Sequence, residues 1–271
     1  MQDISKDISI IHFPSKTEPF VVIEKSRGLP SAPLSDSDTR NAFSIVAREI
    51  PCLLDVQGRK TVEHGLLHRI DTETHGLLLI ASTQEFYDFI LQEQTQGRFI
   101  KTYHAECEFV ANNSQLLDGF PQSEVAVMAS MDTSLFCQQA EVQLIAKHTF
   151  EIASYFRSFG KEQREVRPVT ENSGRAALKK LTLKKQYKTN MKILGWRDNV
   201  FSIECSLKSG YRHQVRCHLA WQNLPIIGDP LYNYFDRSAT SECKRHAMHF
   251  KACALDFYNP ITEQRMHFEM E

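Results

Sequence analysis

Two segments of the chain alternate strictly between apolar and polar residues. In residues 102–109 the apolar positions are Tyr103, Ala105, Cys107 and Phe109, with a polar residue between each pair. Residues 201–208 repeat the pattern. Because successive side chains of a strand point to opposite faces, the alternation predicts two strands, each with one buried face. The chain must therefore build a sheet.

Weaker patterns predict the remaining elements. Residues 20–23 and 77–80 are apolar runs of strand length, and residues 246–257 predict one or two further strands. Helical spacing favours helices over 84–96, which Gly97 would end, and over 211–221. Short strand-like pieces occur at 141–145, 181–183 and 225–230. Many strands with few helices predict an α+β fold, and the aperiodic residues 1–17 predict an N-terminal arm.

Composition excludes several classes of protein. With 271 residues, 42% of them hydrophobic, the chain is long enough to bury a core. No apolar stretch is long enough to span a bilayer, and residues 1–17 carry no signal pattern, so we expect a cytoplasmic protein without membrane contact. The seven cysteines are scattered, odd in number and without a CxxC pair. They predict reduced thiols rather than a disulfide framework or a zinc site.

Charge is unevenly distributed although the net charge is only −1. The segment from Arg157 to Lys192 contains eleven Lys and Arg residues and only three acidic residues, Glu162, Glu165 and Glu171. This surplus could contact phosphates, or it could be an ordinary solvated surface.

Two polar segments are candidates for chemistry. Residues 68–76 place a basic residue, a carboxylate and a glycine just before a buried strand, which is either a site or a plain charged loop. Residues 210–219 would bring Arg212 and Arg216 to one face if they were helical, as a site for phosphate or a carboxylate, or as a basic helix face.

Other kinds of site find no support. The pairs His213/His218 and His246/His249 lack the Cys or carboxylate partners of a zinc site, so we expect no metal. The sequence also contains no P-loop, dinucleotide fingerprint or GxSxG motif.

Taken together, the segments resemble the RluA-type pseudouridine synthases. The hallmark His-Arg-Leu-Asp-x-x-Thr-Ser-Gly of that family appears at 68–76 as His-Arg-Ile-Asp-Thr-Glu-Thr-His-Gly. Its Lys-x-Tyr strand appears at 101–103, its Gly-Arg-Thr-His-Gln-Ile-Arg-x-His-Leu segment at 210–219, and its Gly-x-Pro-Ile-x-Gly-Asp-x-x-Tyr segment at 223–232. An early Lys-Pro-x-Gly-Leu-Pro loop is echoed at 25–30.

The sequence departs from the family pattern at several positions. Thr72 stands where arginine is common, His75 replaces serine, and Ser26 replaces the loop proline. Tyr211-Arg212 replaces Arg-Thr, and Asn223 replaces glycine. None of these changes removes the aspartate, the tyrosine or the last arginine of the motifs, so they bear on substrate choice more than on chemistry.

The resemblance implies a fold and a domain organisation. It implies the pseudouridine synthase catalytic fold, a mixed, largely antiparallel sheet with flanking helices and a central RNA-binding cleft. Residues 18–271 would form a single catalytic domain. We expect no S4-type RNA-binding domain, because the segment before Phe20 is too short for one.

The resemblance also implies a reaction without a cofactor. The enzyme would flip a uridine of tRNA or rRNA out of its stack, break the N1–C1′ bond, turn the base and rejoin it through C5. The central residue would be Asp71, acting as nucleophile or as base. Arg216 would pair with Asp71 and orient it, and Tyr103 would stack on the base.

Further residues would contact the RNA. Val215 would form an apolar wall beside the base, and Arg69 would fill the gap that the flipped base leaves. The other motif residues implied in RNA binding are His68, Lys101, Arg212, His213 and Gln214. The basic segment from Arg157 to Lys192 would hold the RNA backbone.

Two rival functions stay open at this point. A catalytically silent RNA-binding relative would bind RNA without needing Asp71, Tyr103 and Arg216 together. An unrelated hydrolase using Asp71 or His213 would release free base or sugar. For a pseudouridine synthase, RNA is the expected partner, and we expect a monomer that needs no other protein.

Overall fold

The computed structural model describes residues 2–110, 118–121, 149–197, 199–233 and 247–270. The chain forms two compact units, one made of Met1–Tyr103 with Lys251–Glu271 and the other of His104–Phe250. The single catalytic domain over residues 18–271 stays a prediction, because the division into units does not test it.

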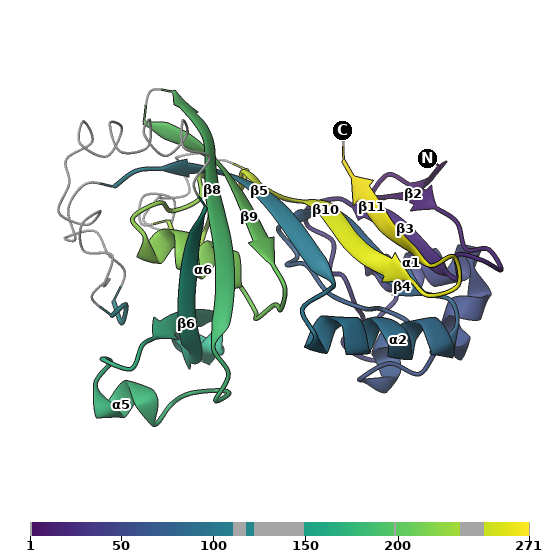
Figure 1. Ribbon diagram of the computed structural model, residues 1–271, viewed down its shortest axis with the longest axis horizontal. Helices are drawn as coiled ribbons and strands as arrows, with labels where there is room; N and C mark the ends of the chain where they lie inside the picture. Colours follow the sequence, from purple (N-terminus) through teal and green to yellow (C-terminus); the bar gives the residue numbers. More distant parts are fainter. Residues whose placement is uncertain (1, 111–117, 122–148, 198, 234–246, 271) are drawn as a thin grey trace. The chain divides into compact units, whose positions relative to one another are not determined.

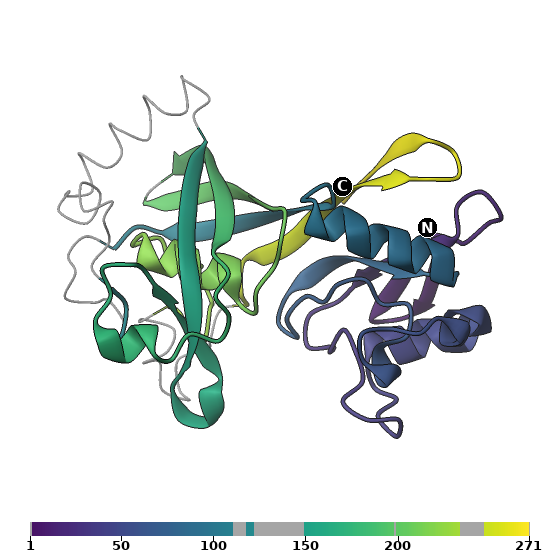
Figure 2. The same cartoon turned by 60° about the horizontal axis from the view of Figure 1, so that its bottom comes forward.

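The first unit is built on a mixed sheet (Figure 1). Its strands are β1 (Gln2–Ser5), β2 (Ile8–His12), β3 (Phe20–Lys25), β4 (His75–Ala81), β10 (Phe250–Asn259) and β11 (Gln264–Glu269). Consecutive strands from β1 to β4 pair antiparallel, as do β10 and β11, whose hairpin is plain in Figure 2. Only β4 and β10 pair parallel among these. The prediction of a mixed, largely antiparallel sheet is confirmed.

Residues 2–12 are strands rather than the irregular arm that their sequence suggested. β1 and β2 have four and five residues, which is too short to show a periodic pattern. Pairing with the buried strand β3 supplies the order that the local sequence lacks, and it buries Ile8 and Ile10.

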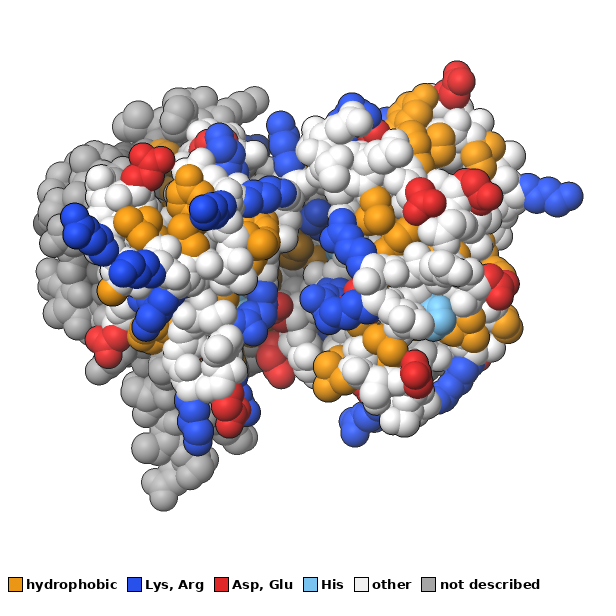
Figure 3. All heavy atoms as spheres, turned by 90° about the horizontal axis from the view of Figure 1, so that it is seen from below, with side chains coloured by type: hydrophobic (Ala, Val, Ile, Leu, Met, Phe, Trp, Pro, Cys, Tyr) orange, Lys and Arg blue, Asp and Glu red, His pale blue; other side chains and the backbone are white. Residues whose placement is uncertain are grey.

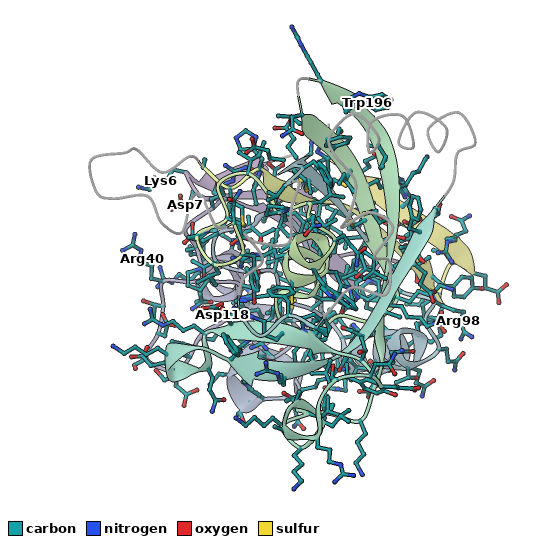
Figure 4. The ribbon with its side chains drawn as sticks, turned by 90° about the vertical axis from the view of Figure 1, so that its left-hand side faces the viewer. Lys6, Asp7, Arg40, Arg98, Asp118 and Trp196 are labelled. Atoms are coloured by element: carbon teal, nitrogen blue, oxygen red, sulfur yellow. The ribbon has the colours of Figure 1, made fainter. Side chains whose placement is uncertain are left out.

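Helices cover the first unit. α1 (Ala42–Glu49) begins where the Asn41 side chain accepts a hydrogen bond from Ser44 N, and the short helices η1 (Pro51–Asp55) and η2 (Thr61–Glu63) follow. α2 (Gln84–Thr95), capped by Thr83, packs Phe86 against Phe20 and Phe257 of the sheet. Beyond α2, Gly97 turns the chain with a φ of +70°, and Arg98 (labelled in Figure 4) pairs with Glu93.

The second unit is an antiparallel sheet with α6 (Gln214–Trp221) against it. The strand β5 (Ile100–Glu108) runs along the chain from the first unit into the second. The others are β6 (Phe150–Phe159), β7 (Glu165–Val169), β8 (Tyr187–Arg197) and β9 (Val200–Leu207), in the order β5-β9-β8-β6-β7. η4 (Lys161–Gln163) and α5 (Arg175–Leu178) lie in its connections. Cys217 and Ala220 of α6 pack with Phe156 and Tyr232.

The strongest sequence patterns predicted real elements. Buried and partly exposed residues alternate along β5 and β9, as expected from residues 102–109 and 201–208. The predicted elements at 20–23, 77–80, 84–96 and 246–257 are confirmed by β3, β4, α2 and β10. The strand at 181–183 is wrong, since only Leu181 makes an isolated bridge, to Arg157. The predicted strand at 141–145 lies outside the described residues.

No helix in the described part of the chain is long and apolar enough to cross a membrane.

Candidate active site

Asp71 lies in a short loop before β4 whose backbone is anchored on both sides. The Ser31 hydroxyl donates to the carbonyl of Ile70 (2.7 Å) and accepts from the Ile70 N–H (3.1 Å). On the other side Thr74 N donates to the Asp71 carbonyl (2.9 Å). The Asp71 side chain itself is half-buried. These bonds fix the backbone from which the Asp71 side chain projects.

Lys25 also forms a hydrogen bond to the Asp71 loop. Its buried ammonium donates to the carbonyls of Leu29 (2.7 Å), Ser26 (2.9 Å) and Thr72 (3.3 Å). Burial lowers the pKa of Lys25 to about 8, while the nearby charges of Asp71 and Glu73 act in the opposite direction. The lysine therefore ties the 25–30 loop to the Asp71 loop, and it brings a positive charge near Asp71.

Tyr103, on β5, is 8% exposed and belongs to the same unit as Asp71. Burial raises the pKa of its phenol, and the charge of Asp71 raises it further. The phenol is therefore neutral at ordinary pH and lies within electrostatic range of Asp71. That Asp71 and Tyr103 share one site stays a prediction.

The end of the 68–76 motif is shaped by strand pairing. Gly76 has a φ of +139°, and a Cβ at this position would lie 2.3 Å from the backbone oxygen of Ala252 on β10. Only glycine admits this close approach of β4 and β10. His75, which replaces the usual serine, meets Glu24 with 2.6 Å between Nε2 and Oε1.

His68 has a structural partner in the backbone of β4. Its Nε2 accepts from Leu79 N (3.1 Å), and burial lowers the pKa of the imidazole to about 3, with a smaller effect from Lys101. His68 is thus a neutral ring that fastens the motif to β4. Lys101, itself buried, lies over the Phe99 ring, 4.5 Å from its centroid.

Arg69 points into solvent. Its side chain is 57% exposed, and Nη1 lies 3.0 Å from Oε1 of Glu63. Because the guanidinium is largely solvated and Glu63 also pairs with Lys60, Arg69 can leave Glu63 at small cost when a ligand arrives.

In the second unit, the helix of the 210–219 segment begins later than predicted. His213 takes the left-handed conformation (φ 55°) immediately before α6, and its Nδ1 lies 3.0 Å from the Tyr232 hydroxyl. Arg212 therefore lies outside the helix, where Nη2 donates to the carbonyls of Gln163 and Glu165. The prediction that Arg212 and Arg216 share a helix face is wrong, because the left-handed residue turns the chain between them.

Arg216 is 3% exposed and paired with the fully buried Asp229. Nε and Nη2 each lie 2.8 Å from a different oxygen of the carboxylate, which also accepts from the N–H groups of Leu231 and Tyr232. A planar guanidinium held at two nitrogens has a fixed orientation. The predicted pairing of Arg216 with Asp71 would join the two units, and it stays a prediction.

The remaining predicted residues of α6 are buried. Val215 is 4% exposed, and the Gln214 amide donates to the carbonyl of Lys188 (2.9 Å) and to the Thr189 hydroxyl (3.1 Å). His218 lies between the hydroxyls of Ser154 and Thr189 at 2.9 and 2.8 Å, and burial lowers its pKa to about 3. This network fixes the helix on the sheet, and a neutral His218 serves structure.

The structure also identifies residues to which the sequence assigned no role. Ser31, Lys25 and Asp229 each hold a motif residue in place. Lys25 lies in the family-like segment 25–30 and Asp229 in the segment 223–232, so the sequence could have indicated both. Ser31 lies in no such segment. Among the described residues, no group of three or more His, Cys, Asp or Glu side chains is arranged to hold a metal ion.

Comparison with known proteins adds to this geometry. The family model for RNA pseudouridylate synthase matches residues 19–221. The chain is 25% identical over 214 residues to the ribosomal large subunit pseudouridine synthase D of Blochmanniella floridana, covering 74% of this chain and 52% of the relative. It is also 25% identical over 260 residues to the protein of that name from Neisseria meningitidis serogroup A, covering 92% and 54%. The chain thus spans about half the length of these relatives.

Among solved structures, human RNA Pseudouridylate Synthase Domain Containing 1 aligns with a TM-score of 0.58 at 15% identity, covering 100% of this chain and 85% of the other. Human RNA Pseudouridylate Synthase Domain Containing 4 aligns at 0.56, also with 15% identity, covering 97% and 87%. At this identity the likeness concerns the fold, and it agrees with the expected α+β architecture.

Proposed function

The chain belongs to the RNA pseudouridylate synthase family, and from this premise we propose that it isomerises uridine in RNA to pseudouridine with Asp71 as the catalytic carboxylate. The observation that carries the proposal is the Asp71 loop. Ser31 and Lys25 form hydrogen bonds to the backbone of this loop, and the neutral phenol of Tyr103 lies within electrostatic range of Asp71. Preorganised groups of this kind suit a reaction that must keep its intermediate in place.

The reaction balances without a cofactor. The N1–C1′ bond of uridine breaks and a C5–C1′ bond forms, while C5 loses its hydrogen and N1 gains a proton. Ordinary glycoside hydrolysis uses two carboxylates around the bond. One carboxylate, acting as nucleophile on the sugar or as base, fits an isomerisation that excludes water.

We assign the other predicted residues to supporting roles. Tyr103 stacks on the uracil, and Arg216, oriented by Asp229, pairs with Asp71. Arg69 fills the place of the flipped base, for which its exposed side chain is suited. Val215 forms an apolar wall beside the base. Lys101, His68, Arg212, His213 and Gln214 would shape the RNA-binding surface.

Ribosomal RNA is the substrate to test first. Relatives that match over most of this chain are named for the large ribosomal subunit. Transfer RNA stays a second candidate, because the motifs that carry the chemistry do not identify the RNA.

Release of tritium from RNA labelled at uridine C5 tests the proposal. Forming the C5–C1′ bond expels this hydrogen, so we expect release by the wild-type protein. Asp71→Asn should lose at least about 1,000-fold in rate, consistent with loss of the central catalytic group. Asp36→Asn, which removes an exposed carboxylate in the same unit, is the matched control and should act like wild type.

The two rivals give different results in the same assay. A silent RNA-binding relative would bind the RNA and release no tritium with either form. A hydrolase would release free uracil, which chromatography of the products would detect and which an isomerase never forms.

A further inference from the structure

The segment 175–185 is a concentrated positive surface. It contains Arg175, Lys179, Lys180, Lys184 and Lys185 and no acidic residue, in a chain whose net charge is −1. All five side chains are exposed. Figure 3 shows more blue than red side chains on the part of the surface at the left, where α5 faces the viewer.

These five charges lack acidic partners within the described residues. Two exposed cations near the segment are paired by contrast: Arg164 lies 2.9 Å from Glu162, and Lys188 lies 2.7 Å from Glu151. The five residues of the segment form no ion pair with any described carboxylate. Lys185 only lies over the Tyr187 ring, 5.3 Å from its centroid. Within the described part of the chain, no carboxylate therefore neutralises these five charges.

The backbone holds these charges close together. Lys179 N donates to the Arg175 carbonyl (3.0 Å), so the two cations stand one helical turn apart on the same side. Further along, Thr182 N donates to the Phe156 carbonyl (3.1 Å), and Leu181 bridges to Arg157 of β6. The segment is thus fixed to the sheet, and its like charges repel unless an anion lies among them.

We propose that residues 175–185 form a phosphate-binding surface that binds the backbone of the RNA. A chain with almost no net charge gains little from long-range attraction to RNA, so a local surface must supply most of the electrostatic affinity. Flexible lysines on a fixed backbone suit phosphates because they recognise charge rather than base sequence. This inference takes RNA as the partner from the proposed function.

The test is the salt dependence of RNA binding, measured by fluorescence anisotropy with a labelled RNA hairpin. The test variant replaces the five residues by glutamine: Arg175→Gln, Lys179→Gln, Lys180→Gln, Lys184→Gln and Lys185→Gln. The control variant removes five exposed charges from the first unit: Lys6→Gln, Lys16→Gln, Arg40→Gln, Arg48→Gln and Arg265→Gln. Lys6 and Arg40 stand out from the ribbon in Figure 4. Both variants change the net charge equally.

We expect the test variant to lose at least tenfold in affinity at low salt. Its plot of log affinity against log salt should flatten by about 2 to 4 units, since each phosphate contact contributes about 0.7 to 0.9. The control variant should keep the wild-type slope. Equal flattening in both variants, or none in the test variant, would overturn the proposal. Circular dichroism and thermal melting verify that both variants fold.

RNA binding does not require catalysis, so the experiments can refute the catalytic proposal and the phosphate-binding surface independently. If wild-type protein releases no tritium but the test variant alone loses RNA binding, the catalytic proposal fails and the surface stands. If tritium release is normal and the test variant binds RNA like wild type, the surface proposal fails and the catalytic proposal stands.

Discussion

Buried polar and charged side chains hold both motif segments in shape. Lys25 and Ser31 fix the backbone around Asp71, while Asp229 fixes the guanidinium of Arg216. Each of these polar groups is buried away from water. Its hydrogen bonds and ion pairs offset the free-energy cost of that burial. The geometry of the candidate site therefore depends on residues outside the predicted catalytic set.

Replacing Asp229 by alanine would leave the Arg216 charge buried without its carboxylate. Breaking such a pair costs about 3–5 kcal/mol, and two backbone N–H groups also lose their acceptor. We expect a loss of this size in the free energy of unfolding by urea, whereas Asp36→Ala on the surface should change it by less than about 0.5 kcal/mol. A loss below about 1 kcal/mol for Asp229→Ala would contradict the buried pair.

Lys25 predicts a dependence of stability on pH. Its pKa is about 8 in the folded protein, against 10.5 ordinarily, so between these values the unfolded chain binds a proton that the folded protein does not. The contribution of Lys25 to stability therefore rises with pH through this window, by up to about 3 kcal/mol. The free energy of unfolding by urea, measured from pH 7 to 10, should rise with pH for wild type relative to Lys25→Met. A constant difference would refute this.

Among the elements, β4 is paired with a strand on both sides. It pairs antiparallel with β3 and parallel with β10, and it follows directly from the Asp71 loop. The parallel pairing begins at Gly76, where the backbone of β10 occupies the space that a side chain would need. The position of the loop is thus coupled to the pairing of two strands that are far apart in the sequence.

Gly76→Ala should disturb both stability and activity. The added Cβ meets backbone at 2.3 Å, and the φ of +139° disfavours alanine, so we expect a loss of about 2–4 kcal/mol together with slower tritium release. Gly174→Ala is the matched control, because its Cβ would meet nothing within 4 Å and its φ is −57°. That change should alter the free energy of unfolding by less than about 1 kcal/mol, because alanine fits the backbone conformation but is a poorer N-cap of α5. Equal melting temperatures of the two variants would argue against the β4–β10 contact.

At the scale of the whole molecule, the described cysteines divide by burial. Cys52 is exposed, Cys253 is partly exposed, and Cys107, Cys205 and Cys217 are buried. Burial raises the pKa of Cys107 and Cys217, so little reactive thiolate is present. Modification of the buried thiols must therefore wait for unfolding of the second unit.

Thiol labelling followed by peptide mass spectrometry tests this division. Under native conditions we expect Cys52 to react at least about 100-fold faster than Cys107, Cys205 and Cys217. In guanidinium chloride all of them should react alike, which serves as the control. Native labelling of Cys217 at the rate of Cys52 would show that α6 opens independently of the sheet.

The sequence by itself determined the elements whose periodicity is strong and the family to which the chain belongs. Alternation along β5 and β9 and the apolar runs of β3 and β4 are local properties, readable without knowing what packs against them. Motif residues such as Asp71 and Tyr103 carried the family resemblance. Only the tertiary structure decided the rest, because it depends on contacts between distant segments. β1 and β2 become strands through pairing, Arg212 is turned out of α6 by the left-handed His213, and Ser31 reaches the Asp71 loop across 39 residues. No local pattern records such contacts, since each partner alone is an ordinary polar or apolar residue.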